Sequence, residues 1–309
     1  MKILTVGTAA LDMIMRTEAL PPQGGRVSLP DHGITYQPSG SGAGCAIALA
    51  KLGAESVFCA RLGADVNGQR LHALYQECGC DTSTMIADPS SPTGTTVILV
   101  ERSGVREIFY PGANRYLSGE NVVAAFSKAR PDALLLQMDI DEGTALTAAT
   151  CASQRGLPII LFGKMGHKFP VEKLPPVDVA CFNEDEIEIL TGTRPTGENT
   201  ALQALLVLSR RLKASYYCIK MGNRGVFLFD GVHRQMISPY LIKVVDAAGG
   251  GEAFVAAMTY LYLTGGKDLS NACRYGNAAA AMTLLRAGTV NAYPTRDELN
   301  AFVAHNGLR

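Results

Sequence analysis

The sequence predicts an α/β protein in which helices cover both faces of a mostly parallel sheet. Short apolar runs of strand length alternate with longer helical patterns, which is the rhythm of repeated β-α-β units. The apolar runs are nearly continuous, as expected for strands buried on both faces. Strands are expected at 3–6, 56–60, 133–137, 158–162, 179–182 and 216–221, and helices at 42–52, 67–79, 143–155, 184–191 and 199–213. These observations predict three layers, α/β/α.

Two regions interrupt this rhythm, residues 12–38 and 94–111. Both contain strand-like segments and turn residues without a helical pattern, and 97–100 with 106–110 are expected to form a β-hairpin around Gly104. A small β layer set apart from the main sheet is expected to act as a lid over a site at the carboxyl ends of the strands. The core is then expected to consist of 1–11, 39–93 and 112–309.

Composition narrows the classes of function. The 309 residues suffice for one large α/β domain or two small ones, and 28 basic residues balance 28 acidic ones without a basic block, which argues against nucleic acid as a partner. There is no run of 18 apolar residues, and residues 1–7 resemble a first strand more than a signal peptide, so no membrane association is expected. The eight cysteines lack zinc-site spacing, which predicts reduced thiols in a cytoplasmic protein.

The most informative segment is 246–254, with the sequence DAAGGGEAF. It follows a β-like run at 240–245 and opens a long apolar helical pattern at 253–263. A glycine-rich turn at a helix N-terminus presents unpaired backbone N–H groups beside the positive end of the helix dipole, so it is suited to bind an anion. Glu252 would repel that anion unless it accepts a proton from the group that attacks it, an arrangement that suits phosphoryl transfer. The alternative is a tight structural turn with an ordinary first-turn acid.

Several other segments carry recognisable motifs. They are 61–68 (RLGADVNG), 110–114 (YPGAN), 182–186 (FNEDE) followed by 190–192 (LTG), and 220–226 (KMGNRGV). Together with 246–254, they resemble the motifs of the ribokinase-like carbohydrate kinases, also called the PfkB family, nearly end to end. The resemblance implies a ribokinase-like three-layer α/β/α fold with a small β-sheet lid. It also implies an ATP- and Mg²⁺-dependent kinase that phosphorylates a hydroxymethyl group of a small sugar or sugar-like substrate.

The resemblance assigns the chemistry to the glycine-rich turn. Glu252 would be the general base that deprotonates the attacking hydroxyl. The backbone N–H groups of Gly249, Gly250 and Gly251 would hold the charge that builds on the transferred phosphoryl group. Many relatives bind a monovalent cation such as K⁺ beside this turn. The matching positions here are Asp246 and the main chain of Ala248, Leu284 and Ala287.

The resemblance also implies a nucleotide site. Its residues are expected to be Asn183, Glu186, Lys220, Gly222, Gly225 and Asn277. Asn183 and Glu186 would organise Mg²⁺ and its waters, with Glu186 acting through water, because oxygen ligands suit this hard ion. Lys220 and Gly222 would line the phosphates and ribose of ATP, and Asn277 would face the adenine. The alternative for Asn183 and Glu186 is a turn residue followed by a first-turn helix acid.

The acceptor sugar is expected between the lid and the turn at 39–44. Asp12 would accept hydrogen bonds from sugar hydroxyls. The other expected substrate residues are Ser39, Gly40, Ser41, Gly42, Gly44 and Asp139. The lid residues His32, Arg106 and Tyr110 are further candidates for substrate contact, although exposed polar residues are ordinary in a lid. If the lid also exposes an apolar face, a homodimer that buries this face is expected.

The sequence departs from the family pattern around the proposed site. Glu252 stands for the usual Asp, Ala247 for a Thr, Ser39 for the first glycine of the sugar-binding turn and Gly44 for its Asn. The added methylene of Glu252 would misplace its oxygens by about 1 Å, which can cost about a hundredfold in rate. Two interpretations follow. Either the pocket is remodelled for a different acceptor, or the chain is a catalytically weak or inactive kinase-fold ligand-binding protein.

Other enzyme classes fit less well. The segment 40–44 superficially resembles a dinucleotide-binding turn, but its spacing is G-x-G-x-G and it does not close a first βαβ unit. Preferential binding of NAD(H) over ATP would favour an oxidoreductase. The sequence also lacks G-x-x-x-x-G-K-[ST], which argues against a Walker-type kinase.

Overall fold

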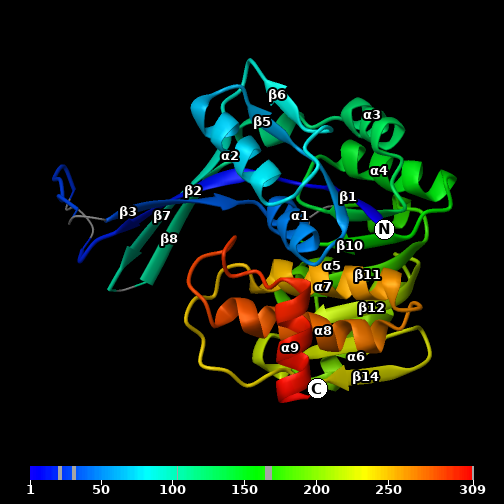
Figure 1. Ribbon diagram of the computed structural model, residues 1–309. Coiled ribbons are helices and arrows are strands. Elements are labelled where there is room, and N and C mark those ends of the chain that lie inside the picture. The colour runs from blue at the N-terminus through cyan, green and yellow to red at the C-terminus, as the bar shows by residue number, and fades with distance from the viewer. Residues whose placement is uncertain (20–22, 30–32, 103, 164–168, 308–309) are drawn as a thin grey trace.

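The computed structural model describes residues 1–19, 23–29, 33–102, 104–163 and 169–307. Its centre is an eight-stranded sheet with the order β14-β13-β12-β11-β10-β9-β1-β4 (Figure 1). The strands are β1 (Lys2–Val6), β4 (Glu55–Cys59), β9 (Ala133–Gln137), β10 (Ile159–Phe162), β11 (Val177–Asn183), β12 (Ala214–Lys220), β13 (Val226–Phe229) and β14 (Arg234–Ile237). The strands from β4 to β12 pair in parallel, and β13 and β14 extend one edge antiparallel.

Helices cover both faces of this sheet, which confirms the predicted three layers. One face packs against α1 (Ser41–Lys51), α2 (Val66–Glu77), α7 (Gly250–Thr264), α8 (Leu269–Leu284) and α9 (Arg296–Asn306). The other packs against α3 (Gly119–Ala129), α4 (Glu142–Gln154), α5 (Glu184–Thr191) and α6 (Glu198–Ser209). Successive strand residues alternate between the two cores, so Leu135 joins the first and Leu134 and Leu136 join the second.

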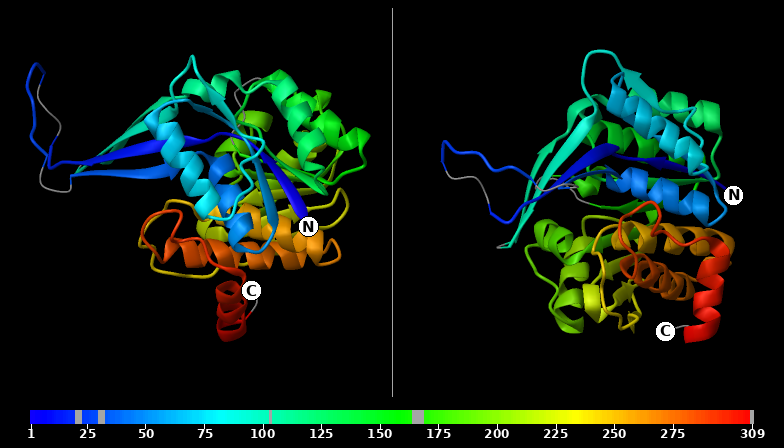
Figure 2. Two further views of the ribbon diagram at one scale, coloured as in Figure 1. Left: turned by 45° about the horizontal axis from the view of Figure 1, so that its top comes forward. Right: turned by 60° about the vertical axis from the view of Figure 1, so that its left-hand side comes forward.

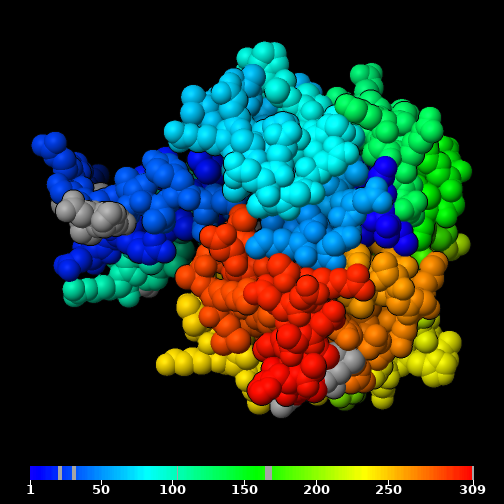
Figure 3. Space-filling model, in the orientation of Figure 1, coloured from blue at the N-terminus to red at the C-terminus, as the bar shows by residue number. Residues whose placement is uncertain are grey.

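A second, four-stranded sheet projects from the side of this body (Figures 2 and 3). Its order is β3-β2-β7-β8, and its strands are β3 (Ile34–Ser39), β2 (Ala10–Arg16), β7 (Gly94–Glu101) and β8 (Gly104–Tyr110). The pair β2–β7 is parallel and the other pairs are antiparallel. The predicted hairpin is confirmed as β7–β8. The smallest sheet pairs β5 (Arg61–Gly63) with β6 (Ile86–Asp88).

Strand register separates the projecting sheet into two faces of different character. Asp12 pairs with Thr96, which in turn pairs with Phe109, so these side chains share one face. The opposite face carries Tyr36 and Ile108, which are 59% and 68% exposed. An exposed apolar face of this kind is unusual for a surface sheet.

Two expected element boundaries are wrong. The β-like run at 240–245 forms no strand. It leads from the edge strand β14 to the end of α8, where Val245 N donates to Leu284 O at 2.8 Å. The side chains of this run divide between core and solvent: Tyr240 is buried, whereas Leu241 is 80% exposed. The helix expected at 199–213 ends at Ser209. Within the described residues, no helix is both long enough and apolar enough to cross a membrane.

Candidate active site

A cavity of about 310 Å³ lies where the projecting sheet meets the core. Its floor contains the start of α1 and the start of α7, and its wall contains the polar face of the projecting sheet. Of the predicted acceptor and catalytic residues, the lining includes Asp12, Ser39, Gly40, Ser41, Gly44, Asp139, Gly249 and Glu252. Residues far apart in the chain therefore meet around a space of the size that small-molecule sites require.

Gly42 is the predicted substrate residue that does not line this cavity. A Cβ on Gly42 would lie 2.8 Å from the backbone of Gly7, at the end of β1. The glycine therefore allows α1 to pack closely against the strand. Its role in the structure is helix–strand packing beneath the cavity.

The glycine-rich turn forms the start of α7 as predicted. Gly249 is the N-cap and has a left-handed backbone conformation with φ 79°, which favours glycine. The first intrahelical bond runs from Ala253 N to Gly249 O, so the N–H groups of Gly250, Gly251 and Glu252 precede it. This helix start therefore provides amides suited to an anion.

Glu252 lies between this helix start and α1. Its Oε1 accepts a hydrogen bond of 2.8 Å from Ser41 Oγ. The phenol ring of Tyr293 lies nearby and is buried, and both burial and the Glu252 charge raise the pKa of Tyr293 well above its usual value. Tyr293 therefore stays neutral beside the acid.

Asp12 contributes an acceptor atom to the cavity wall. Burial raises the pKa of Asp12 above its usual value, and the nearby Glu107 carboxylate raises it further. Polar contacts with Ser39 and Thr96 lower this pKa, but by less. Asp12 Oδ1 is buried and has no hydrogen-bond partner among the described residues. Thr289, which also lines the cavity, has an Oγ1 atom that is likewise buried and without a hydrogen-bond partner among the described residues. A ligand with hydroxyl groups would satisfy such atoms.

Among the described residues, the charged side chains of the cavity lining are all acidic. They are Asp12, Glu107, Asp139 and Glu252.

Two lid candidates face away from this cavity. Arg106 and Tyr110 do not line it, whereas their neighbours Glu107 and Phe109 do. Alternate residues of a strand point to opposite faces, so the expected contacts are wrong by one residue. His32 lies outside the described residues.

On the nucleotide side, Asn183 and Glu186 form a reciprocal cap at the start of α5. Asn183 Oδ1 accepts from Glu186 N at 2.8 Å, and Glu186 Oε2 accepts from Asn183 N at 2.7 Å. The structural alternative for both residues is therefore realised. Both side chains carry oxygen atoms at the end of β11, and oxygen is the ligand type that Mg²⁺ prefers.

Lys220 ends β12 opposite Asn183 and reaches the glycine-rich turn. Its Nζ lies 3.5 Å from the position that a Cβ on Gly251 would occupy. Burial lowers the pKa of Lys220, but the surrounding acidic groups of Cys181, Glu186 and Glu252 raise it above its usual value. Lys220 therefore carries a positive charge beside the anion-binding amides.

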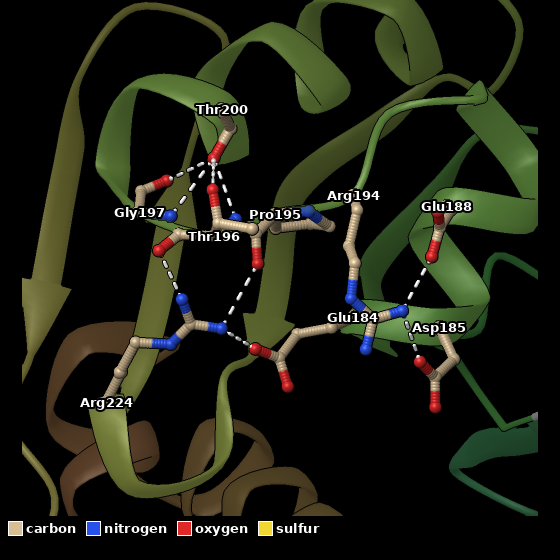
Figure 4. Close-up of polar contacts among 9 residues, drawn as sticks. All are labelled: Glu184, Asp185, Glu188, Arg194, Pro195, Thr196, Gly197, Thr200 and Arg224. Carbon is tan, nitrogen blue, oxygen red and sulfur yellow. Dashed lines mark hydrogen bonds and ion pairs between the residues drawn. The ribbon is translucent and has the colours of Figure 1, made fainter.

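The turn that contains Gly222 and Gly225 is fixed by Arg224. The Arg224 guanidinium pairs with the Glu184 carboxylate at the start of α5 and donates to the carbonyl oxygens of Thr196 and Pro195 (Figure 4). A separate ion-pair set joins Arg194 to Asp185 and Glu188 at 2.7 and 2.6 Å (Figure 4). Both arginines thus hold the loop after α5 against the first turns of that helix.

Asn277 is buried in α8, and its Nδ2 donates to Ser238 O at 2.9 Å. It therefore holds the segment after β14 against the helix. A second amide donor remains for another group.

The expected monovalent-cation positions lie on two adjacent segments. Asp246 Oδ1 accepts from Ala248 N at 3.0 Å, and Asp246 Oδ2 accepts from Gly288 N at 2.9 Å. Leu284 O accepts from Val245 N at 2.8 Å, and Ala287 precedes Gly288. In the described residues, no group of three or more His, Cys, Asp or Glu side chains could hold a metal. A K⁺ site here would therefore depend on backbone carbonyl oxygens.

Several site residues were not identified from the sequence. Glu107, Thr289 and Tyr293 line the cavity, but no local motif marks them. Gln137 is buried beneath the cavity, and its Oε1 accepts from Thr8 N at 2.7 Å. Asn114 lay within a recognised segment, and its amide binds both backbone groups of Ala9.

A sugar-sized polar cavity beside an acid and an anion-binding helix start defines a phosphotransferase acting on small hydroxyl compounds. Comparisons with known proteins agree. The model of the pfkB family carbohydrate kinases matches residues 1–296. The chain is 28% identical over 307 residues to a ribokinase of Haemophilus influenzae, covering 98% of this chain and 99% of the relative.

Two further relatives extend this result. A bifunctional ribokinase/ribose-5-phosphate isomerase A of Fructilactobacillus sanfranciscensis is 28% identical over 304 residues, and the match covers 96% of this chain but only 55% of that longer protein. The structure of Arabidopsis thaliana ribokinase complexed with ribose and ATP has a TM-score of 0.88 and 25% identity, covering 98% of each chain. The chain belongs to the pfkB family of carbohydrate kinases.

Proposed function

We propose that this carbohydrate kinase transfers the γ-phosphoryl group of ATP to a hydroxymethyl group of a small sugar or sugar-like acceptor, with Glu252 as general base. The observation that carries the proposal is the place of Glu252. Its carboxylate lines a sugar-sized cavity and lies on the first turn of α7, next to the amides of the glycine-rich turn. An acid and an anion site are thereby combined within one helix turn.

The reaction follows from these positions. Glu252 Oε1 is held by Ser41, and Oε2 makes no hydrogen bond to the described residues, so Oε2 is available to take the hydroxyl proton. The acceptor oxygen then forms a bond to the γ-phosphorus, and the bond from that phosphorus to the bridging oxygen breaks, releasing ADP. The N–H groups of Gly250 and Gly251, with the Lys220 ammonium, stabilise the charge on the transferred group.

The nucleotide would lie over the ends of β11 and β12. Lys220 and the turn at 222–225 would bind phosphates and ribose, and Asn277 would contact the adenine. When bound, Mg²⁺ would neutralise phosphate charge, with Asn183 and Glu186 holding its waters. Asp246 with the carbonyls of 248, 284 and 287 would bind K⁺ and strengthen the anion site.

The acceptor would be neutral or cationic. Asp12 would accept hydrogen bonds from the acceptor hydroxyls, and the Glu107 carboxylate would repel a phosphate or carboxylate group. Sugar phosphates and sugar acids are therefore disfavoured, and neutral pentoses, hexoses, nucleosides and amino sugars remain.

The projecting sheet, residues 12–38 and 94–111, would act as the lid of the remaining core. Its polar face would close over the acceptor and exclude water from the transferred phosphoryl group. Its apolar face, with Tyr36 and Ile108, would be buried in a homodimer. Sedimentation of the purified protein tests the dimer.

A screen of ADP release tests the proposal. Neutral sugars, amino sugars, nucleosides and sugar phosphates are supplied with ATP and Mg²⁺, and the productive acceptor is then used with Glu252→Gln and Glu252→Asp. We expect Glu252→Gln to lose about 10²–10⁴-fold in kcat, and Glu252→Asp, which keeps a carboxylate, to lose less. The matched control is Glu198→Gln, which changes an exposed first-turn acid of α6 and should leave kcat unchanged.

The outcomes separate the candidates. Normal turnover in Glu252→Gln would remove the base role. If calorimetry shows that ATP and a sugar both bind, and no acceptor elicits ADP release, the chain is an inactive ligand-binding relative instead.

A further inference from the structure

The space occupied by the Glu252 side chain exists because residue 44 has no side chain. A Cβ on Gly44 would lie 2.8 Å from Glu252 Cγ and 3.1 Å from Glu252 Cβ. It would also lie 2.7 Å from Tyr293 Oη. Real Cβ atoms do not approach other heavy atoms so closely, and buried Tyr293 closes the other side. Any side chain at position 44 therefore competes with Glu252 for the same volume.

The opposite side of this volume is formed by Ser41. Ser41 is the first residue of α1 and Gly44 lies one turn further, so both face α7 from the same helix end. The 2.8 Å hydrogen bond from Ser41 Oγ fixes Glu252 Oε1. A shorter acid at position 252 would withdraw from Ser41 by about the length of one carbon–carbon bond, roughly 1.5 Å.

We propose that Gly44 and Glu252 form a matched pair: the missing side chain at 44 leaves room for Cβ and Cγ of Glu252, and Ser41 positions the carboxylate that the longer acid brings to it. The two departures from the family pattern, Glu for Asp and Gly for Asn, are then coupled substitutions. Glu252 is an adapted base rather than a sign of lost activity. Gly44 and Ser41 are positioning residues, because they act through Glu252. This inference rests on the proposed function of Glu252.

A double-mutant cycle tests the pair. In the native background, Gly44→Ala displaces the carboxylate, and we expect kcat to fall about a hundredfold, as for a 1 Å misplacement. In the Glu252→Asp background, the carboxylate no longer reaches Ser41, so it is already displaced before the methyl group is added. The same Gly44→Ala change should then reduce kcat less than about tenfold. Gly44→Asn with Glu252→Asp restores the usual family pair and should exceed Gly44→Asn alone by at least about tenfold.

Two further measurements separate positioning from folding. Ser41→Ala adds no bulk and should lower kcat about tenfold, with the KM for ATP unchanged, because the nucleotide contacts lie elsewhere. Melting temperatures of all variants show whether Gly44→Ala acts by unfolding. The control Gly197→Ala places a methyl group at the N-cap of α6, where no atom lies within 4 Å, and should leave kcat unchanged.

The outcomes are decisive for the pair. Equal fold-losses from Gly44→Ala in the two backgrounds would overturn it, as would normal kcat in both Gly44→Ala and Ser41→Ala. If Glu252→Gln is inactive while the cycle is additive, the base role stands and only the pairing fails. If Glu252→Gln is fully active, the proposed function itself fails.

Discussion

Asn114 connects the projecting sheet to the core, and its replacement by Ala should destabilise the protein measurably. Asn114 Oδ1 accepts from Ala9 N at 2.9 Å, and Nδ2 donates to Ala9 O at 2.8 Å and to Pro111 O at 2.9 Å. Ala9 is fully buried and directly precedes β2. The substitution therefore leaves a buried N–H and a buried C=O without partners.

The size of the effect follows from these contacts. Each unsatisfied buried group costs about 1–3 kcal/mol, so two such groups give roughly 3 kcal/mol in the free energy of unfolding. For a chain of 309 residues, the entropy of unfolding is about 0.65 kcal/mol/K. The melting temperature of Asn114→Ala should therefore fall by about 5 °C.

Calorimetry and steady-state kinetics measure both consequences. Because Asp12 lies on β2 just beyond Ala9, the KM for the acceptor should rise while the KM for ATP stays constant. The control is Asn199→Ala, an exposed residue of α6 that should melt as the native protein does. A fall in melting temperature no larger than that of the control would refute the reasoning, because the three bonds would then carry no stability.

Two further predictions concern charged residues of the site. Lys220→Met should lower kcat by about 10²–10³-fold in single-turnover experiments, since it removes a charge from the anion site. The control Lys213→Met changes an exposed lysine and should have no effect. Equal rates in Lys220→Met and the native protein would exclude Lys220 from the reaction. The KM for the acceptor should rise as the pH falls through the raised pKa of Asp12, because protonation removes a hydrogen-bond acceptor, and Asp12→Asn should abolish this dependence. A carboxyl group whose pKa is raised by folding contributes stability below its usual pKa, and this contribution is lost as the pH increases. The free energy of unfolding of Asp12→Asn should therefore increase relative to that of the native protein from pH 4 to pH 7.

The layers of the fold were predictable because buried parallel strands carry a local signal. The run at 133–137 is apolar except for its last residue, Gln137, and it forms β9 with the expected ends. The run at 240–245 has a similar pattern and forms no strand. The backbone at the end of this run bonds to α8 instead, through Val245 N and Leu284 O. This contact depends on distant residues, so a local pattern cannot contain it.

The site was predictable where one short motif carries it. The start of α7, with Glu252 and its glycines, needs only neighbouring residues. Tyr293 and Glu107 reach the cavity through tertiary contacts and strand register, for which the sequence gives no local sign. The choice of Arg106 and Tyr110 over Glu107 and Phe109 shows the cost of a one-residue error in register, since it exchanges the two faces of a strand.

The arrangement of the cavity gives a reason why this chain departs from its family mainly on the acceptor side. The chemistry depends on the first turn of α7 and on Lys220, both within the core. The acceptor wall contains Asp12, Glu107 and Phe109, all from the projecting sheet. Changes in that sheet can therefore alter the acceptor without moving the amides or the ammonium group. Gly44, Ala247 and Glu252 are departures that lie in the core, and under the proposed pairing Gly44 and Glu252 change together.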